Sequence, residues 1–205
     1  MSKFAKMVEQ EKIKQRAINL QQVRTDLQST GKTYQDIVNK IDNFIERWNK
    51  MFTREEIINN INTNDIIAAI FAKDPTKQNI SEKLCETYIG IKRASQSGKN
   101  CIRFSESGEI VHSKKDGGSK SVDFILPNEI YATQKYTGDN TGGAQDNQFD
   151  DVVIFLKYGS IYHKVAAIVD GWYWEENGER EHLKDMFKDN PNVYIFSADD
   201  LQKEG

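Results

Sequence analysis

The amino-acid sequence predicts an α/β protein, with a mixed central β-sheet flanked by helices and an N-terminal helical extension. Residues 2–49 repeat apolar side chains at three- and four-residue steps, which is the spacing of amphipathic helices. Short runs rich in β-branched and aromatic residues follow in the middle of the chain, between Gly and Pro turn signals. From residue 149 onward, helical and extended patterns alternate. This succession is typical of a mixed sheet covered by helices.

Length and composition set the expected organisation and exclude several classes of protein. A chain of 205 residues with 38% hydrophobic content buries one good core and a small helical appendage, which we place at residues 74–205 and 1–73. Two cysteines are too few for a disulfide framework, and no Cys/His spacing fits zinc. Residues 1–22 lack an apolar targeting segment, and no run is long enough to span a membrane. We therefore expect a soluble, cytoplasmic protein without membrane contact.

The N-terminal helices are predicted in order from their caps and breaks. A first helix ends at Gly31, and a second runs to Trp48 with Thr33 as its cap. The run 53–56 has the form of a capping box and opens a shorter helical region, which the Asp-Pro pair at 74–75 ends. The next helix begins near Asn79 or Ser81. It carries Glu82 and Glu86 on one i, i+4 row.

Two hairpins and an alternating C-terminal part follow. Residues 101–104 and 109–112 form the first hairpin, and residues 120–126 and 130–136 the second, around a Pro-Asn break. The helical pattern at 149–156 also fits a buried strand, but the Gln/Asn/Asp run leads into it without a turn signal, which favours a helix. Residues 165–169 form a strand buried on both faces, 179–188 a helix, and 193–196 a last strand before a short helix capped by Ser197.

The turn of the second hairpin decides which side chains meet. A three-residue turn at 127–129 places Asp123 across from Thr133, on the face of Lys135. A two-residue turn makes Asp123 face Ala132 and Gln134 instead. We favour the three-residue turn, because it gathers a carboxylate and an ammonium. An aspartate beside a lysine suits metal-assisted phosphodiester hydrolysis, in which Mg²⁺ is held by the carboxylate and the lysine orients or activates the attacking water. The alternative is an ion pair on a solvated hairpin.

The order of these elements resembles the PD-(D/E)XK nuclease superfamily. A helix precedes a strand pair that bears Asp123 and Lys135, and helix, strand, helix and strand follow. Within that superfamily, several runs are similar to type II restriction endonucleases. These runs are 74–79, 120–124, 133–137, 142–148 and 169–172, and the resemblance covers roughly residues 74–200.

The resemblance implies a restriction-endonuclease-like core and a Mg²⁺-dependent enzyme that cuts double-stranded DNA at specific sequences. It makes Asp123 a metal ligand and Lys135 the water-orienting lysine, and it expects a second carboxylate where this chain has Thr133. Cutting both strands of a symmetric site favours a homodimer, for which residues 1–73 supply the interface or a clamp on DNA. Candidates for the second acid, of which Glu86 and Asp146 are favoured, are Glu82, Glu86, Glu129, Asp146 and Asp150.

Further residues are candidates for contacts with DNA. Gln145 and Gln148 are placed to bond a phosphate or the waters of the metal, or else to cap and solvate a helix. The basic loop with Lys114, Lys115 and Lys120 contacts phosphates or is merely solvated. Trp174, in an aromatic triplet, stacks on bases or packs at a buried edge or dimer contact.

The sequence leaves two other functions open. The loop at Gly142 and Gly143 has the wrong spacing for a nucleotide cofactor, and the three histidines have no nucleophile beside them. Thr133 in place of an acid favours a nuclease-fold protein that binds DNA without cutting it. Because the net charge is −3, DNA binding would depend on a local basic patch. The negative charge favours a helical protein interaction module instead.

Overall fold

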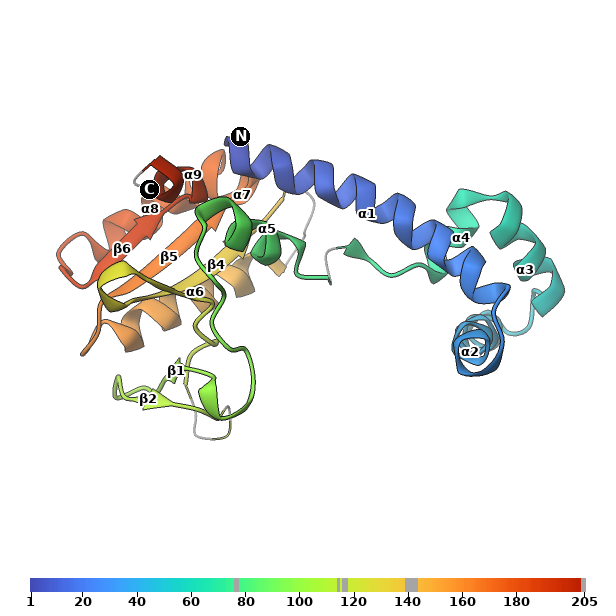
Figure 1. The fold of residues 1–205 in the computed structure, drawn as a ribbon, viewed down its shortest axis with the longest axis horizontal. Coiled ribbons are helices and arrows are strands. Elements are labelled where there is room, and N and C mark those ends of the chain that lie inside the picture. The colour runs from blue at the N-terminus through green and yellow to red at the C-terminus, as the bar shows by residue number, and fades with distance from the viewer. Residues whose placement is uncertain (76–77, 114, 116–117, 139–143, 204–205) are drawn as a thin grey trace. The chain divides into compact units, whose positions relative to one another are not determined.

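A computed structural model of the chain describes residues 1–75, 78–113, 115, 118–138 and 144–203, without the side chains of 144–146 and 203. It divides into two compact units, one of residues 9–80 and one of residues 1–8 with 81–205 (Figure 1). The first helix, α1 (Lys3–Leu27), contributes to both. The division lies at residue 80 where residue 73 was expected, and residues 1–8 belong to the larger unit, in which Phe4 and Val8 are fully buried in a core. Among the described helices, none combines the length and apolarity of a membrane span.

The helical unit contains the rest of α1, α2 (Gly31–Arg47), α3 (Arg54–Thr63) and α4 (Asp65–Phe71). The capping box predicted for α3 is confirmed: Thr53 accepts the N–H of Glu56, and the Glu56 carboxylate accepts the N–H of Thr53. The N-cap of α2 is Thr30 and not Thr33. The core of this unit consists of Val23, Ile37, Ile41, Ile57, Ile61, Ala68 and Phe71.

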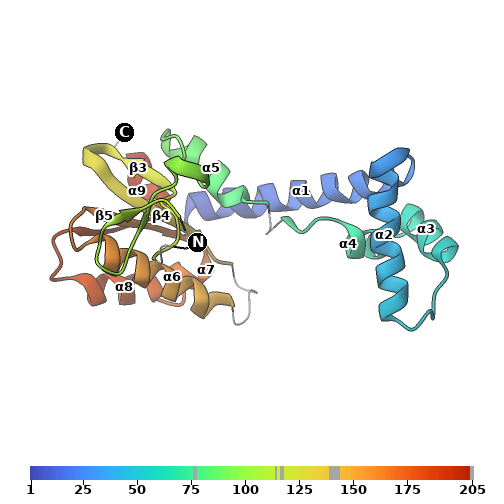
Figure 2. The same cartoon turned by 90° about the horizontal axis from the view of Figure 1, so that it is seen from below.

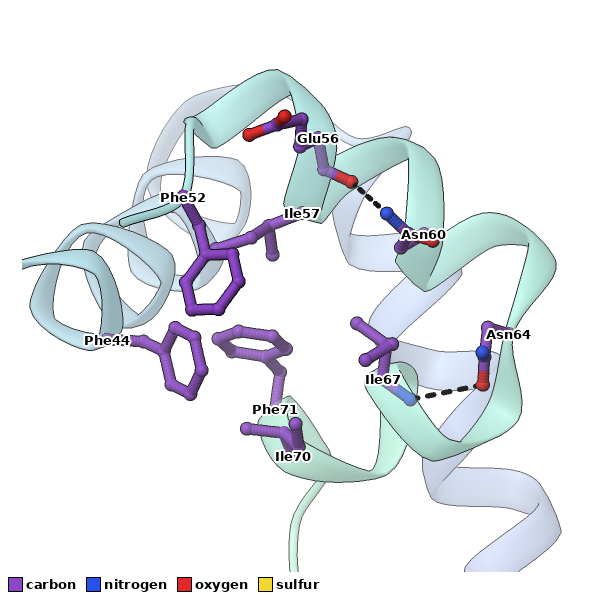
Figure 3. Close-up of a pocket in the computed structure, with 9 residues that line it drawn as sticks. All are labelled: Phe44, Phe52, Glu56, Ile57, Asn60, Asn64, Ile67, Ile70 and Phe71. Atoms are coloured by element: carbon purple, nitrogen blue, oxygen red, sulfur yellow. Dashed lines mark hydrogen bonds between the residues drawn. The ribbon is translucent and has the colours of Figure 1, made fainter. Parts of the chain in front are cut away.

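An apolar cavity of about 210 Å³ lies beside this core (Figure 3). The ring of Phe44 lies 5.4 Å from that of Phe71 and 6.0 Å from that of Phe52. The polar groups at its edge are engaged locally, since Asn60 donates to the carbonyl of Glu56 and Asn64 accepts the N–H of Ile67. The cavity is therefore lined by apolar groups and already bonded amides.

The larger unit is an α/β structure around a mixed sheet, as predicted. Its strands are β3 (Phe124–Leu126), β4 (Ile130–Tyr136), β5 (Val165–Asp170) and β6 (Val193–Phe196), in that order across the sheet. β3 is antiparallel to β4, and the other pairs are parallel. A separate hairpin joins β1 (Arg103–Phe104) to β2 (Ile110–Val111). Every residue of β5 is buried, which confirms the predicted central strand.

Helices cover both faces of this sheet (Figure 2). The predicted helix at 149–156 is part of α6 (Ala144–Gly159), which packs on one face with α7 (Trp172–Glu175) and α8 (Glu179–Phe187). The other face is covered by α5 (Ile80–Ile89), α9 (Ala198–Lys203) and the start of α1. Side chains alternate between the two faces, so Tyr131 belongs to the α6 side while Ala132 belongs to the α5 side.

The first turn of α1 is fixed to the carboxyl edge of the sheet. Asp199 accepts the backbone N–H groups of Lys3 and Phe4 at 2.9 and 3.1 Å, and it also accepts the hydroxyl of Tyr88 at 2.8 Å. The first N–H groups of a helix have no partner within the helix. A carboxylate accepts hydrogen bonds from them, and its negative charge interacts favourably with the positive end of the helix dipole. This arrangement explains why residues 1–8 belong to the α/β unit.

Candidate active site

The hairpin of β3 and β4 has the predicted three-residue turn. Leu126 lies opposite Ile130, and Pro127–Glu129 form the connection. Asn128 and Glu129 both have positive φ, which an Asn adopts more readily than other non-glycine residues. The register pairs Phe124 with Ala132, and this brings Asp123 next to Thr133. The expected juxtaposition of Asp123 and Thr133 is therefore confirmed.

Asp123 is a buried carboxylate with one engaged oxygen. Its Oδ2 accepts the hydroxyl of Thr133 at 3.1 Å and the backbone N–H of Gln134 at 2.8 Å. Its own N–H donates to the carbonyl of Ala132 at 2.8 Å, which continues the hairpin pairing. Within the described part of the chain, no hydrogen bond reaches Oδ1. The carboxylate is thus held rigidly at the sheet edge and keeps one oxygen for another partner.

Lys135 follows two residues after Thr133 and is half-buried. Burial raises the pKa of Asp123 and of Glu82 on α5, and the positive charge of Lys135 offsets part of that rise, so the ammonium lies within electrostatic reach of both acids. It makes no hydrogen bond or ion pair with the residues that the structure describes. Within the described ranges, the ammonium thus keeps its donors for a water molecule or a ligand.

Glu82 is the second acid at this site. Burial raises its pKa most, and the charge of Asp123 raises it further. Burial likewise raises the pKa of Asp123, against the opposing effects of Lys135 and of the bonds to its Oδ2. Glu86, which was favoured from the sequence, lies one turn further along α5. Because the charge of Asp123 raises the pKa of Glu82, we favour Glu82 over Glu86 as the second acid of the site.

These residues fit a divalent cation bound partly by the substrate. Asp123 is buried and the side chain of Glu82 is 24% exposed, and both carboxylates are hard oxygen ligands of the kind that Mg²⁺ prefers. The side chain of Gln134 is 1% exposed, and neither its oxygen nor its nitrogen has a partner among the described residues. It points to the face covered by α5, as Ala132 does. No group of three His, Cys, Asp or Glu side chains meets in the described ranges. Mg²⁺ commonly takes one or two carboxylates, with waters and phosphate oxygens as the remaining ligands.

Arg93 belongs to the site and was missed in the sequence. Its backbone bridges to Phe124, and the next N–H, that of Ala94, donates to the carbonyl of Asp123 at 2.8 Å. Its guanidinium forms an ion pair with Glu82, and its charge offsets part of the rise that burial causes in the pKa of both acids. The segment after α5 thus pairs with β3 over a separation that no local pattern reveals.

Asp170 is a second missed residue, at the end of β5. It is 0% exposed, and its two oxygens accept the N–H of Ala198 at 3.3 and 3.1 Å. Burial raises the pKa of Asp170 to about 7, far above the usual aspartate value. An acid ending a continuous apolar strand was the available signal, and it was interpreted as the end of the strand and as part of the run 169–172, without a role at the site.

The aromatic DNA contact expected at Trp174 is corrected by the structure. Trp174 is 1% exposed and lies in the core with Phe155 and Leu183. Its Nε1 donates to the hydroxyl oxygen of Thr137 at 3.1 Å, and Thr137 donates to Oε1 of Gln148 at 2.6 Å. A side chain buried in this way cannot stack on a base, and Gln148 is partly engaged in the same network.

The other predicted residues are either exposed or lie outside the described side chains. Lys115 and Lys120 are exposed, and Lys120 forms an ion pair of 3.6 Å with Asp151. Glu129 is exposed at the turn, and Asp150 is exposed on α6. Lys114 and the side chains of Gln145 and Asp146 lie outside the described residues. Comparison of the chain with protein-family models, curated proteins and solved structures gave no match.

Proposed function

We propose that the chain is a Mg²⁺-dependent, sequence-specific endonuclease of the type II restriction kind, acting on double-stranded DNA in the cytoplasm. The core at 74–205 is then a restriction-endonuclease-like fold. The observation that supports this most is the Asp123–Thr133 pairing, which sets a carboxylate directly beside β4, the strand that carries Lys135. Glu82 supplies the acid that Thr133 cannot.

Each residue has a distinct role in this proposal. Asp123 and Glu82 hold the cation through their oxygens, and Lys135 bonds and orients the attacking water. When bound, Mg²⁺ neutralises the charge that builds on the phosphate and makes water a better nucleophile. The bonds from Thr133 and Gln134 keep the Asp123 carboxylate in one orientation, so that no reorganisation is needed when substrate arrives.

A homodimer follows from the same proposal, because two active sites related by a two-fold axis cut both strands of a symmetric sequence. The helical unit supports this role through its exposed apolar side chains. Trp48 is 53% exposed, Met51 is 73% exposed and Ile70 is 51% exposed. Apolar groups of this size on a surface are typical of protein interfaces.

The test is incubation of the purified chain with long duplex DNA in Mg²⁺, beside a Lys135→Ala control. Discrete, reproducible fragments that are absent from the control would support the proposal. DNA that stays intact in Mg²⁺ and in Mn²⁺ would refute cleavage.

A second candidate, DNA binding without cleavage, is favoured by two observations. Thr133 brings no charge to the site, and Glu82 is already paired with Arg93. A protein of this kind retards the migration of one duplex sequence in a gel and does not cut that duplex. Its affinity falls steeply as salt rises, because phosphate contacts release counterions. An affinity that does not change with salt would refute this candidate as well.

A further inference from the structure

Arg93 is positioned beside both acids and has no role in the mechanism above. Its backbone is held next to β3, through the bridge to Phe124 and the 2.8 Å bond between the N–H of Ala94 and the carbonyl of Asp123. From there its guanidinium reaches Glu82, on α5. The side chains of Arg93 and Glu82 are 18% and 24% exposed, so the ion pair is largely screened from water.

The guanidinium is incompletely bonded in this position. Its Nε is buried and has no partner within the described part of the chain. A guanidinium has five donors in a planar fork that matches the oxygens of a carboxylate or phosphate in two-point contacts. Leaving a buried donor unpaired costs free energy. A second position in which the guanidinium bonds a ligand more completely would recover that free energy.

Arg93 and a metal ion would compete for the same oxygens. Glu82 offers its Oε2 to Arg93, and Asp123 lies in the same electrostatic field. Two cations within a few ångströms of each other in a poorly solvated site repel strongly. The guanidinium therefore opposes the binding of a divalent cation by Glu82, and binding is more favourable once the guanidinium has moved away.

We propose that Arg93 is the resident counter-cation of the Asp123–Glu82 pair, that a divalent cation displaces it, and that the released guanidinium binds the substrate phosphate. This inference rests on the proposed function. Arg93 is a positioning residue in the metal-free protein and a phosphate ligand in the complex. The exchange keeps the two acids compensated before metal arrives, and it couples metal binding to the appearance of a phosphate-binding group.

The test measures Mn²⁺ binding to the full chain without DNA, with free Mn²⁺ followed by electron paramagnetic resonance. The variants are Arg93→Gln, which removes the charge, and Asp123→Asn as the control that removes a ligand. We expect Arg93→Gln to bind Mn²⁺ about threefold or more tightly than the unmodified chain, since a competing charge is gone. At saturating metal, the same variant should cleave DNA about tenfold or more slowly.

If Arg93 had only a structural role, Arg93→Gln would lower both the Mn²⁺ affinity and the DNA cleavage rate. Tighter Mn²⁺ binding together with slower cleavage therefore distinguishes the exchange from a structural role. Mn²⁺ affinity of Arg93→Gln at or below that of the unmodified chain would overturn the inference and leave the nuclease proposal standing. Equal Mn²⁺ binding by the unmodified chain and Asp123→Asn would overturn the nuclease proposal itself. If Arg93→Gln does not fold, Arg93→Lys replaces it. Its ammonium pairs less well with Glu82, so tighter Mn²⁺ binding supports the exchange, and unchanged or weaker binding refutes it.

Discussion

Thr133 donates a hydrogen bond of 3.1 Å to the carboxylate of Asp123 across the hairpin of β3 and β4. Both side chains are buried, with Thr133 1% and Asp123 6% exposed. Threonine at this position donates a hydrogen bond to the carboxylate and places no second negative charge beside it. The site consequently needs its other acid from a different element, and Glu82 on α5 is the one that the Asp123 charge affects.

Removal of the Thr133 hydroxyl should destabilise the fold. Thr133→Val keeps the shape and leaves Asp123 with one fewer donor, which we expect to cost about 1 to 3 kcal/mol, the range for a buried group that loses its hydrogen-bond partner. Thr133→Ser keeps the hydroxyl and serves as the control. Urea unfolding measures both, and equal stability of the two variants would contradict the role given to this bond.

The two acids of α5 should differ sharply in activity. Glu82→Gln removes the carboxylate near Asp123 and should lower the DNA cleavage rate about 100-fold or more. Glu86→Gln changes the next acid on the same row of the helix and should leave the rate within about twofold. Single-turnover cleavage of a plasmid compares them. A larger loss in Glu86→Gln than in Glu82→Gln would reverse the assignment.

Asp170 should make the protein less stable as pH rises. Its pKa is about 7 in the folded state and near 3.8 when unfolded, so between these values the folded state holds a proton that the unfolded state has lost. Stability contributed by the protonated form is complete below about pH 4 and is lost as pH rises to about 7. The full difference corresponds to about 4 kcal/mol, because each pKa unit is about 1.4 kcal/mol.

Asp170→Asn should remove this dependence, since the amide stays neutral and its oxygen still accepts the N–H of Ala198. Relative to the variant, the unmodified chain should lose about 2 to 3 kcal/mol between pH 5 and pH 8 in urea unfolding. Parallel pH profiles of the two proteins would show that Asp170 is ionised throughout.

Two glycines in the left-handed region give a matched test of the turn after β5. At Gly171, with φ of 101°, an added Cβ would lie 2.4 Å from the carbonyl oxygen of Thr137, so Gly171→Ala should cost about 3 kcal/mol or more. Gly178 has φ of 82° with open space around it, and Gly178→Ala should cost only about 1 kcal/mol. Thermal unfolding ranks them, and similar losses would refute the close approach of residues 137 and 171.

Local patterns in the sequence were sufficient for much of the fold. The Pro-Asn signal predicted the hairpin, and a continuous apolar run predicted β5. The hairpin register was chosen between two alternatives because a three-residue turn gathers Asp123 and Lys135. The N-terminal helices followed from periodicity and from the capping box at Thr53. These features depend on neighbours within a few residues, which is why sequence alone reveals them.

Non-local contacts account for what the sequence did not predict. Arg93 reaches the site because its segment pairs with β3, about thirty positions later, and Glu82 is selected over Glu86 by the packing of α5 on the sheet. Trp174 is buried because α7 folds back onto α6, a contact that an aromatic triplet does not encode. Phe4 and Val8 join the larger unit because Asp199 caps α1.

The central claim is that Asp123 holds the catalytic cation, and the Mg²⁺ dependence of DNA cleavage by the unmodified chain and by Asp123→Asn tests it most directly. The amide keeps an oxygen for the N–H of Gln134 but loses the charge that binds metal. We expect the DNA cleavage rate of the unmodified chain to rise to saturation with Mg²⁺. The cleavage rate of the variant should be about 100-fold lower or more at every Mg²⁺ concentration. Equal rates in the two proteins would contradict it.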